Sequence, residues 1–119
     1  MKELTLPQYN LVFKESHAIL VMQKGFAVTV EIAEEITKHL EEYYNGRDFI
    51  FLTHRKFFHD IDLNVYKGRI LKNMIGYGIV SDDPLEAKRA MHEQSLWNEA
   101  FTFFEQLEEA ENWAGSFFN

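Results

Sequence analysis

The apolar and polar residues of this chain alternate in blocks that predict strands and helices in turn. One block has four consecutive large apolar residues, Phe49–Leu52, which follow an Asn45-Gly46 turn and precede the polar residues 53–56. A short apolar run without polar alternation is typical of a strand covered on both faces, as in a parallel sheet beneath helices. We therefore expect Phe49–Leu52 to lie inside a sheet between parallel neighbours, with His54 and Arg55 at its rim.

Two further strands are predicted before this run and two after it. Residues 9–14 alternate between apolar and polar side chains, which indicates a half-buried strand. After a turn at 15–17, the apolar run Ala18–Met22 predicts its antiparallel neighbour. Met74–Val80 and Ala100–Phe104 have the same strand-like composition. The sequence therefore predicts five strands.

Helical spacing is clearest upstream of Phe49. Thr29 is a suitable N-cap, the Asn45-Gly46 pair supplies a left-handed end, and apolar residues recur every three or four positions between them, at Ile32, Ile36, Leu40 and Tyr43. Later in the chain, Asp83 before Pro84, with Glu86 in a capping-box position, predicts a helix that reaches Leu96 or Trp97. The residues from 105 onward have an acidic first turn and helical spacing, which predicts a terminal helix.

Residues 60–71 fit two structures. Asp60 or Asp62 can cap a helix whose apolar residues would be Leu63, Val65, Tyr66, Ile70 and Leu71, whereas the alternation of apolar residues at 61, 63 and 65 also permits a strand. We choose the helix, because the preceding strand must return to a parallel neighbour through a crossover. The expected architecture is therefore α/β, with one domain over residues 1–119, a single mixed, mostly parallel five-stranded sheet and about four helices.

Composition excludes several classes of function. The 119 residues carry a net charge of −7 with a pI near 5.2, which disfavours binding to nucleic acid phosphates and to anionic membrane surfaces. The chain has no Cys, so disulfides, thiolate zinc sites and thiol nucleophiles are excluded. It shows neither a signal-peptide pattern nor an apolar run of membrane-spanning length. We expect a cytoplasmic protein that does not insert into membranes.

A polar cluster follows the predicted central strand and is the candidate ligand site. In open α/β sheets, ligands bind beyond the carboxyl ends of the strands, so the position suits a site. Histidine and carboxylate at short spacing can bind a metal, and an arginine can hold an anion. The alternative is a solvated loop with a helix-capping Asp. No third zinc ligand is evident, so we predict no metal site. The candidate ligand-binding residues are His54, Arg55, His59 and Asp60.

No catalytic residue or cofactor is predicted. The Gly-x-Ser-x-Gly motif is absent, and no Ser, His and Asp residues form a recognisable nucleophilic set. Gly76-x-Gly78 lacks the third glycine of a dinucleotide fingerprint and lies within a strand, so strand packing explains it better.

Aromatic residues supply the remaining signal. The chain has eleven Phe residues, and its aromatic side chains have more apolar area than five short strands can easily bury. The excess fits either a crowded core or a surface that contacts a partner, since aromatic residues anchor protein interfaces. We expect a homodimer or an unidentified protein partner. The candidate interaction surface comprises Phe57, Phe58, Trp97, Phe117 and Phe118.

The order of the predicted elements, together with the closing segment Phe101–Trp113, resembles the SpoIIAA-like branch of the STAS superfamily. Small bacterial members of this branch end in a short aromatic strand followed by a helix with an acidic start, an Ala and a Trp. The resemblance implies a single mixed sheet with helices mainly on one side, and no catalytic role. Related folds also bind lipids, so the resemblance leaves ligand binding open.

The chain departs from this branch at the regulatory serine. In the anti-sigma-factor antagonists, a phosphorylatable Ser opens the helix after the third strand, whereas here residues 53–62 contain no Ser. We expect a non-enzymatic regulatory or protein-interaction module that lacks this phosphoacceptor. The alternative is a small-ligand or lipid-binding domain with a pocket between sheet and helices. A third and weaker alternative is a hydrolase or metal enzyme built on the residues from His54 to Asp62.

Overall fold

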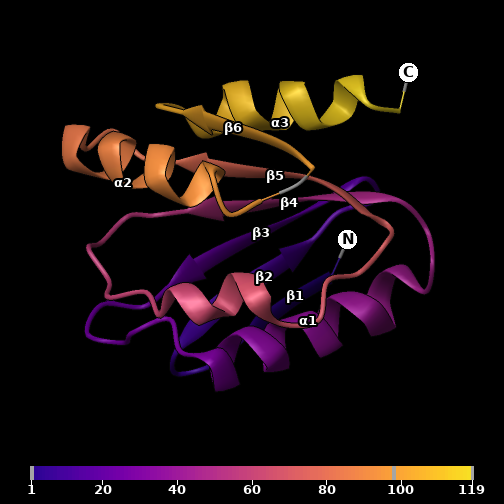
Figure 1. Cartoon of the computed structure of the whole chain (residues 1–119). Helices are drawn as coiled ribbons and strands as arrows, with labels where there is room; N and C mark the ends of the chain where they lie inside the picture. The colour runs from indigo at the N-terminus through magenta and orange to yellow at the C-terminus, as the bar shows by residue number, and fades with distance from the viewer. Residues whose placement is uncertain (1, 98, 119) are drawn as a thin grey trace.

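The computed structural model describes residues 2–97 and 99–118, which form one six-stranded sheet, three α-helices and one short 3-10 helix (Figure 1). The first three strands pair antiparallel and the last four pair parallel. The strands cross the sheet in chain order: β1 (Lys2–Thr5), β2 (Tyr9–Phe13), β3 (His17–Met22), β4 (Phe49–His54), β5 (Met74–Val80) and β6 (Ala100–Phe104). The helices are α1 (Val30–Tyr44), η1 (Leu63–Lys67), α2 (Pro84–Gln94) and α3 (Leu107–Ser116).

Strand β4 lies inside the sheet, parallel to both β3 and β5. Phe49, Ile50 and Leu52 are all 0% exposed. The ring of Phe49 stacks on Tyr44 of α1 with a centroid distance of 4.1 Å, whereas Ile50 and Leu52 pack in the cluster that α3 completes. The prediction that this tetrapeptide is covered on both faces is therefore confirmed.

Helices α1 and α2 cover one face of the sheet, and α3 covers the other (Figure 1). Helix α1 buries Ile36 and Leu40 against β2 and β3, and α2 packs Ala90 against Tyr77 and Ile79 of β5. Two of the three described α-helices thus share one face, as the resemblance implied. Between them, the sheet is covered by the segment from residue 55 to residue 73.

The helix ends follow the predicted capping chemistry. The Thr29 hydroxyl accepts a hydrogen bond from the Ile32 amide at 3.1 Å, and Asn45 ends α1 in the left-handed conformation with φ 46°. The Asp83 carboxylate accepts from the Leu85 amide at 2.9 Å, and Pro84 occupies the first turn of α2. These local signals therefore place both helices correctly.

The predicted helix over residues 60–71 is wrong. Only η1 forms there, capped by Asp62, whose carboxylate accepts from the Asn64 amide at 2.9 Å. None of the η1 residues is buried, so no apolar stripe anchors a longer helix, and Gly68 ends the turn. A parallel bridge between Val28 and Ile61 holds the start of the segment.

The predicted strand count is also short by one. Lys2–Thr5 forms β1, which pairs with β2 at the edge of the sheet. Its side chains are mostly exposed, so the sequence shows no apolar alternation there. Within the described residues, no helix combines the length and the apolar character that a membrane crossing requires.

Candidate functional site

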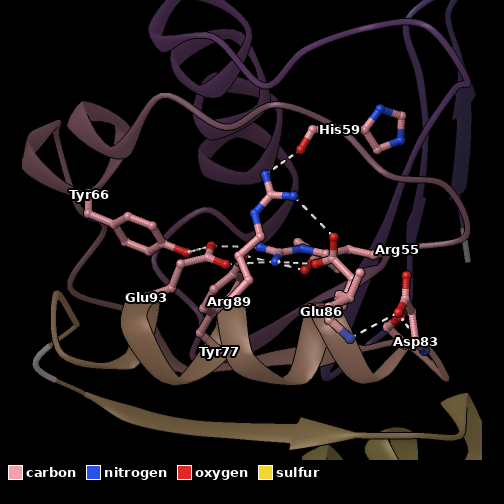
Figure 2. Close-up of polar contacts among 11 residues, drawn as sticks. Arg55, His59, Tyr66, Tyr77, Asp83, Glu86, Arg89 and Glu93 are labelled. Carbon is pink, nitrogen blue, oxygen red and sulfur yellow. Dashed lines mark hydrogen bonds and ion pairs between the residues drawn. The ribbon is translucent and has the colours of Figure 1, made fainter.

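Arg55, directly after β4, is the centre of a buried polar network (Figure 2). Its guanidinium donates to both carboxylate oxygens of Glu93 at 2.7 Å and to Oε2 of Glu86 at 3.1 Å. The two glutamates lie seven residues apart on α2, so both point from one face of that helix toward β4. The Glu93 side chain is 0% exposed and that of Arg55 is 10% exposed, so the ion pair is shielded from solvent.

Two more side chains extend this network to the loop and to η1. Arg89 of α2 donates to Oε1 of Glu86 at 3.1 Å and to the carbonyl oxygen of His59. Tyr66 of η1 donates its hydroxyl to Oε1 of Glu93. The network therefore connects β4, α2, η1 and the loop before η1, as Figure 2 shows.

The network keeps Glu93 and Arg55 ionised. Burial alone raises the pKa of Glu93, but the hydrogen bonds and the charge of Arg55 outweigh burial and hold this pKa below its ordinary value. Burial likewise lowers the pKa of Arg55, but the hydrogen bonds that Arg55 donates to Glu93, together with the charges of Tyr77, Glu93 and Tyr66, raise it by more. Two arginines and two glutamates thus neutralise one another. Nearby, burial lowers the pKa of His54, which favours the neutral imidazole.

A cavity of about 130 Å³ lies beside this network, between the sheet, α1, α2 and the segment that carries η1. Most of its wall is apolar. The apolar part comprises Leu20, Met22, Val28, Ala33, Ile36, Leu40, Phe51, Ile61, Val65 and Met74. The polar and aromatic part comprises Thr37, Thr53, His54, Arg55, His59, Tyr66, Arg69, Tyr77, Glu86, Arg89, Glu93 and Trp97. An apolar hollow with a polar wall at one end is the usual form of a small-molecule site.

A second hollow of about 350 Å³ adjoins the cavity on its outer side, between α1 and η1. Ala33, Thr37, Val65 and Arg69 line both spaces. Arg69 pairs with Glu41 of α1 at 2.8 Å, and both of these side chains are about half exposed. The shared residues therefore mark the boundary between the cavity and the outer groove.

Three of the four predicted ligand-binding residues line the cavity. His54, Arg55 and His59 are in its wall, and Nδ1 of His59 donates to the Phe26 carbonyl at 2.6 Å. Asp60 is exposed instead, and its backbone carbonyl accepts from the Val28 amide. Three of the residues that follow the central strand thus lie together in the wall, while Asp60 lies outside it.

The five aromatic residues predicted as an interaction surface lie in separate places. Phe57 and Phe58 are exposed in the loop after β4. The Arg89 guanidinium lies over the Phe58 ring, with its Cζ atom 4.8 Å from the ring centroid. Trp97 is half-buried and packs on Tyr77 in the cavity wall. Phe117 and Phe118 lie beyond α3, which covers the opposite face (Figure 1).

The sequence reasoning missed the α2 half of the site. Glu86 was predicted to complete a capping box, but both of its carboxylate oxygens accept from arginines instead. Glu86, Arg89 and Glu93 lie at i, i+3 and i+7, and this spacing on a helix that follows a buried strand was the available signal. Within residues 2–97 and 99–118, no three His, Asp or Glu side chains are grouped closely enough to hold a metal ion.

Comparison with known proteins identifies the fold. No protein-family model matches this sequence, and no curated protein matches it. Among solved structures, the chain is similar to an uncharacterised protein of the DUF3478 family from Shewanella loihica PV-4, which has a SpoIIAA-like fold. The TM-score is 0.59 at 15% identity, over 89% of this chain and 91% of the other. The chain therefore has the SpoIIAA-like fold that its sequence indicated.

Proposed function

We propose that this protein is a non-enzymatic SpoIIAA-like module that binds a small molecule in the cavity between the sheet and helices α1 and α2. The observation that carries the proposal is the cavity itself, about 130 Å³ with a mainly apolar wall and the Arg55 network at one end. The interior of a domain is normally close-packed, so a hollow of this size beneath two helices leaves apolar side chains without packing partners, which costs stability. A ligand-binding role thus gains support over a solely protein-interacting role.

The state of the charged groups supports a role without catalysis. Each carboxylate oxygen of Glu86 and Glu93 accepts a hydrogen bond from an arginine. A general acid or base needs a pKa near the working pH, whereas the pKa of Glu93 is below its ordinary value. The network is therefore suited to hold the wall of the cavity in place.

The proposal does not include a phosphorylation switch after the central strand. Residues 53–62 contain no Ser, and they lead into η1 rather than into an α-helix. Five residues of 3-10 helix offer little of the aligned backbone dipole that makes a helix N-terminus receive added negative charge.

A second candidate function is protein interaction with self-association, and exposed apolar side chains favour it. Phe58 and Leu85 are each 69% exposed and Met91 is 73% exposed, and the Phe58 ring contacts Arg89 on α2, the helix that carries Leu85 and Met91. Native mass spectrometry of the purified protein tests this function. A dimer mass would support it, and a monomer at micromolar concentration would oppose it.

A cavity-filling substitution tests the primary proposal. Ala33 lies on α1 and lines the cavity, so Ala33→Leu should fill part of the space and abolish binding. Ala87→Leu is the matched control, because Ala87 is also half-buried on a helix but does not line the cavity. A library of small molecules would be screened by amide chemical shifts in two-dimensional NMR.

We expect at least one compound to shift the amides of cavity residues in the wild type and in Ala87→Leu, and to cause no shift in Ala33→Leu. If no compound of a size that fits the cavity moves those amides in the wild type, the proposed function is wrong.

A further inference from the structure

The size of the cavity limits what it can hold. At about 130 Å³ it is close to an engineered cavity of about 150 Å³ that admits benzene. A molecule with a single ring therefore fits the inner space, and anything longer must extend past Val65 and Arg69 into the outer groove.

Within the described residues, every arginine and glutamate side chain that lines the cavity already has an ion-pair partner. Arg55 and Arg89 are paired with Glu86 and Glu93, and Arg69 is paired with Glu41 at the boundary. An ionised group that enters an apolar space loses its hydration and gains no unpaired counter-charge here. The wall therefore selects against anions and cations and in favour of neutral molecules.

Two buried hydroxyl groups in the wall have unused hydrogen-bonding capacity. Thr53 of β4 and Tyr77 of β5 are 7% and 8% exposed, and their hydroxyl oxygens lie 3.4 Å apart. An ordinary O–H···O bond is about 2.7–2.8 Å long, so this contact is weak. The Thr53 hydroxyl can donate once and accept twice, and the Tyr77 phenol can donate and accept. Within the described residues neither hydroxyl has a second partner, so both can bond to a ligand.

The aromatic neighbours of Tyr77 hold its ring in one orientation. Phe51 lies at a centroid distance of 5.7 Å, Trp97 at 5.6 Å and Phe101 at 5.3 Å. The Tyr77 hydroxyl is thus presented at a fixed point beside Thr53, which is the condition for selective recognition of one polar group.

We propose that the cavity binds a neutral molecule with a single ring and one hydroxyl or carbonyl group, and that Thr53 and Tyr77 recognise this group. The inference rests on the proposed function, because it names the class of ligand for the same cavity. It adds that the specificity-determining groups are these two hydroxyls, with the Arg55 network as a fixed and electrically neutral wall.

Toluene, phenol and benzoate test this inference, because they share one ring and differ in the group attached to it. Dissociation constants would be measured by NMR titration for the wild type and for Thr53→Val and Tyr77→Phe, each of which removes one hydroxyl with little change in shape. Thr102→Val and Tyr43→Phe are the matched controls, since neither residue lines the cavity. Circular dichroism would verify that each variant is folded.

We expect each cavity variant to weaken phenol binding about fivefold, as the loss of one hydrogen bond of about 1 kcal/mol predicts, and to change toluene binding less than twofold. The controls should leave both constants unchanged, and benzoate should bind at least tenfold more weakly than phenol.

Phenol binding that is unaffected by both cavity variants, or benzoate binding tighter than phenol, would overturn the inference. The proposed function survives that result if toluene still binds the wild type and Ala33→Leu abolishes its binding. If none of the three compounds binds, the inference is overturned, and the library screen decides the proposed function separately.

Discussion

The two faces of the sheet are packed in opposite ways. On the α3 face, Ala110 and Ala114 lie against Ile50 and Leu52, and all four side chains are 0% exposed. The glycines of β5 make room there for the side chains of β4, because a Cβ atom on Gly78 would lie 2.7 Å from Leu52 Cδ2 and one on Gly76 would lie 2.6 Å from Ile50 Cδ1. Small residues on both sides thus allow the helix to lie close to the sheet.

On the other face, α1 and α2 cover different parts of the sheet, and residues 55–73 bridge the space between them (Figure 1). This segment contains only η1, none of whose residues is buried, and it is attached through polar contacts such as the bond between Tyr66 and Glu93. An irregular cover fills space less completely than a helix does. One face of the sheet is thus closely packed, whereas the other face keeps a hollow beneath its cover.

The largest loss of stability is expected when the charge of Glu93, which pairs with Arg55 beside the cavity, is removed. Glu93→Gln keeps the shape of the side chain but leaves Arg55 buried with one carboxylate partner, Glu86. Breaking a buried ion pair on one side is strongly destabilising, so we expect the free energy of unfolding to fall by about 3 kcal/mol in urea titrations.

Glu42→Gln, at an exposed site on α1, is the control and should change this free energy by less than about 0.5 kcal/mol. Equal stability of Glu93→Gln and the wild type would show that the network does not support this face.

A smaller loss of stability is expected from a substitution on the face that α3 covers. Gly78→Ala adds a methyl group where Leu52 must move, so we expect a loss of about 1–2 kcal/mol in the free energy of unfolding. Gly115→Ala is the matched control, because a Cβ atom there has no neighbour within 4 Å and lies in α3, so this change should add about 0.5 kcal/mol. If both substitutions change the free energy of unfolding in the same direction, the sheet is not closely packed beneath α3.

The smallest loss of stability is expected at the polar contact that joins α3 to the start of β3. Glu111 accepts from Lys14 at 2.7 Å and lies 2.8 Å from Nε2 of His17. Burial raises the pKa of Glu111, but the hydrogen bonds from Lys14 and His17 outweigh it, so the pKa lies below its ordinary value of 4.5. The contribution to stability is therefore complete above pH 4.5 and is lost as the pH falls through the lowered value.

Glu111→Gln should lower the free energy of unfolding by about 1 kcal/mol or less at pH 7, with a smaller difference from the wild type at pH 3. Urea titrations at both pH values measure this difference. A difference that stays constant or grows on acidification would contradict the assigned direction of the pKa.

The sequence predicts much of the fold because its signals there are local. The apolar run at 49–52 and the caps at Thr29 and Asp83 each identify an element without reference to the rest of the chain. Strand β1 was missed because an exposed edge strand needs no apolar alternation. Residues 60–71 were misassigned because their apolar side chains serve as a partial cover, which no periodic pattern encodes.

The candidate site was predicted only in part, for a similar reason. His54, Arg55 and His59 follow the central strand, so their position in the sheet was enough to place them at the rim. Glu86 and Glu93 were not identified, because a glutamate on a helix is usually exposed. Their burial depends on a specific partner, Arg55, from a distant part of the chain, and one sequence does not show such a pairing.

A crystal structure determined under xenon pressure would reveal the hollow between α1 and the sheet, since xenon occupies apolar cavities in proteins. We predict xenon density in the cavity between Ile36 of α1 and Phe51 of β4, and none between α3 and the sheet. A cavity filled by side chains with no xenon, or xenon bound beneath α3 instead, would contradict the account.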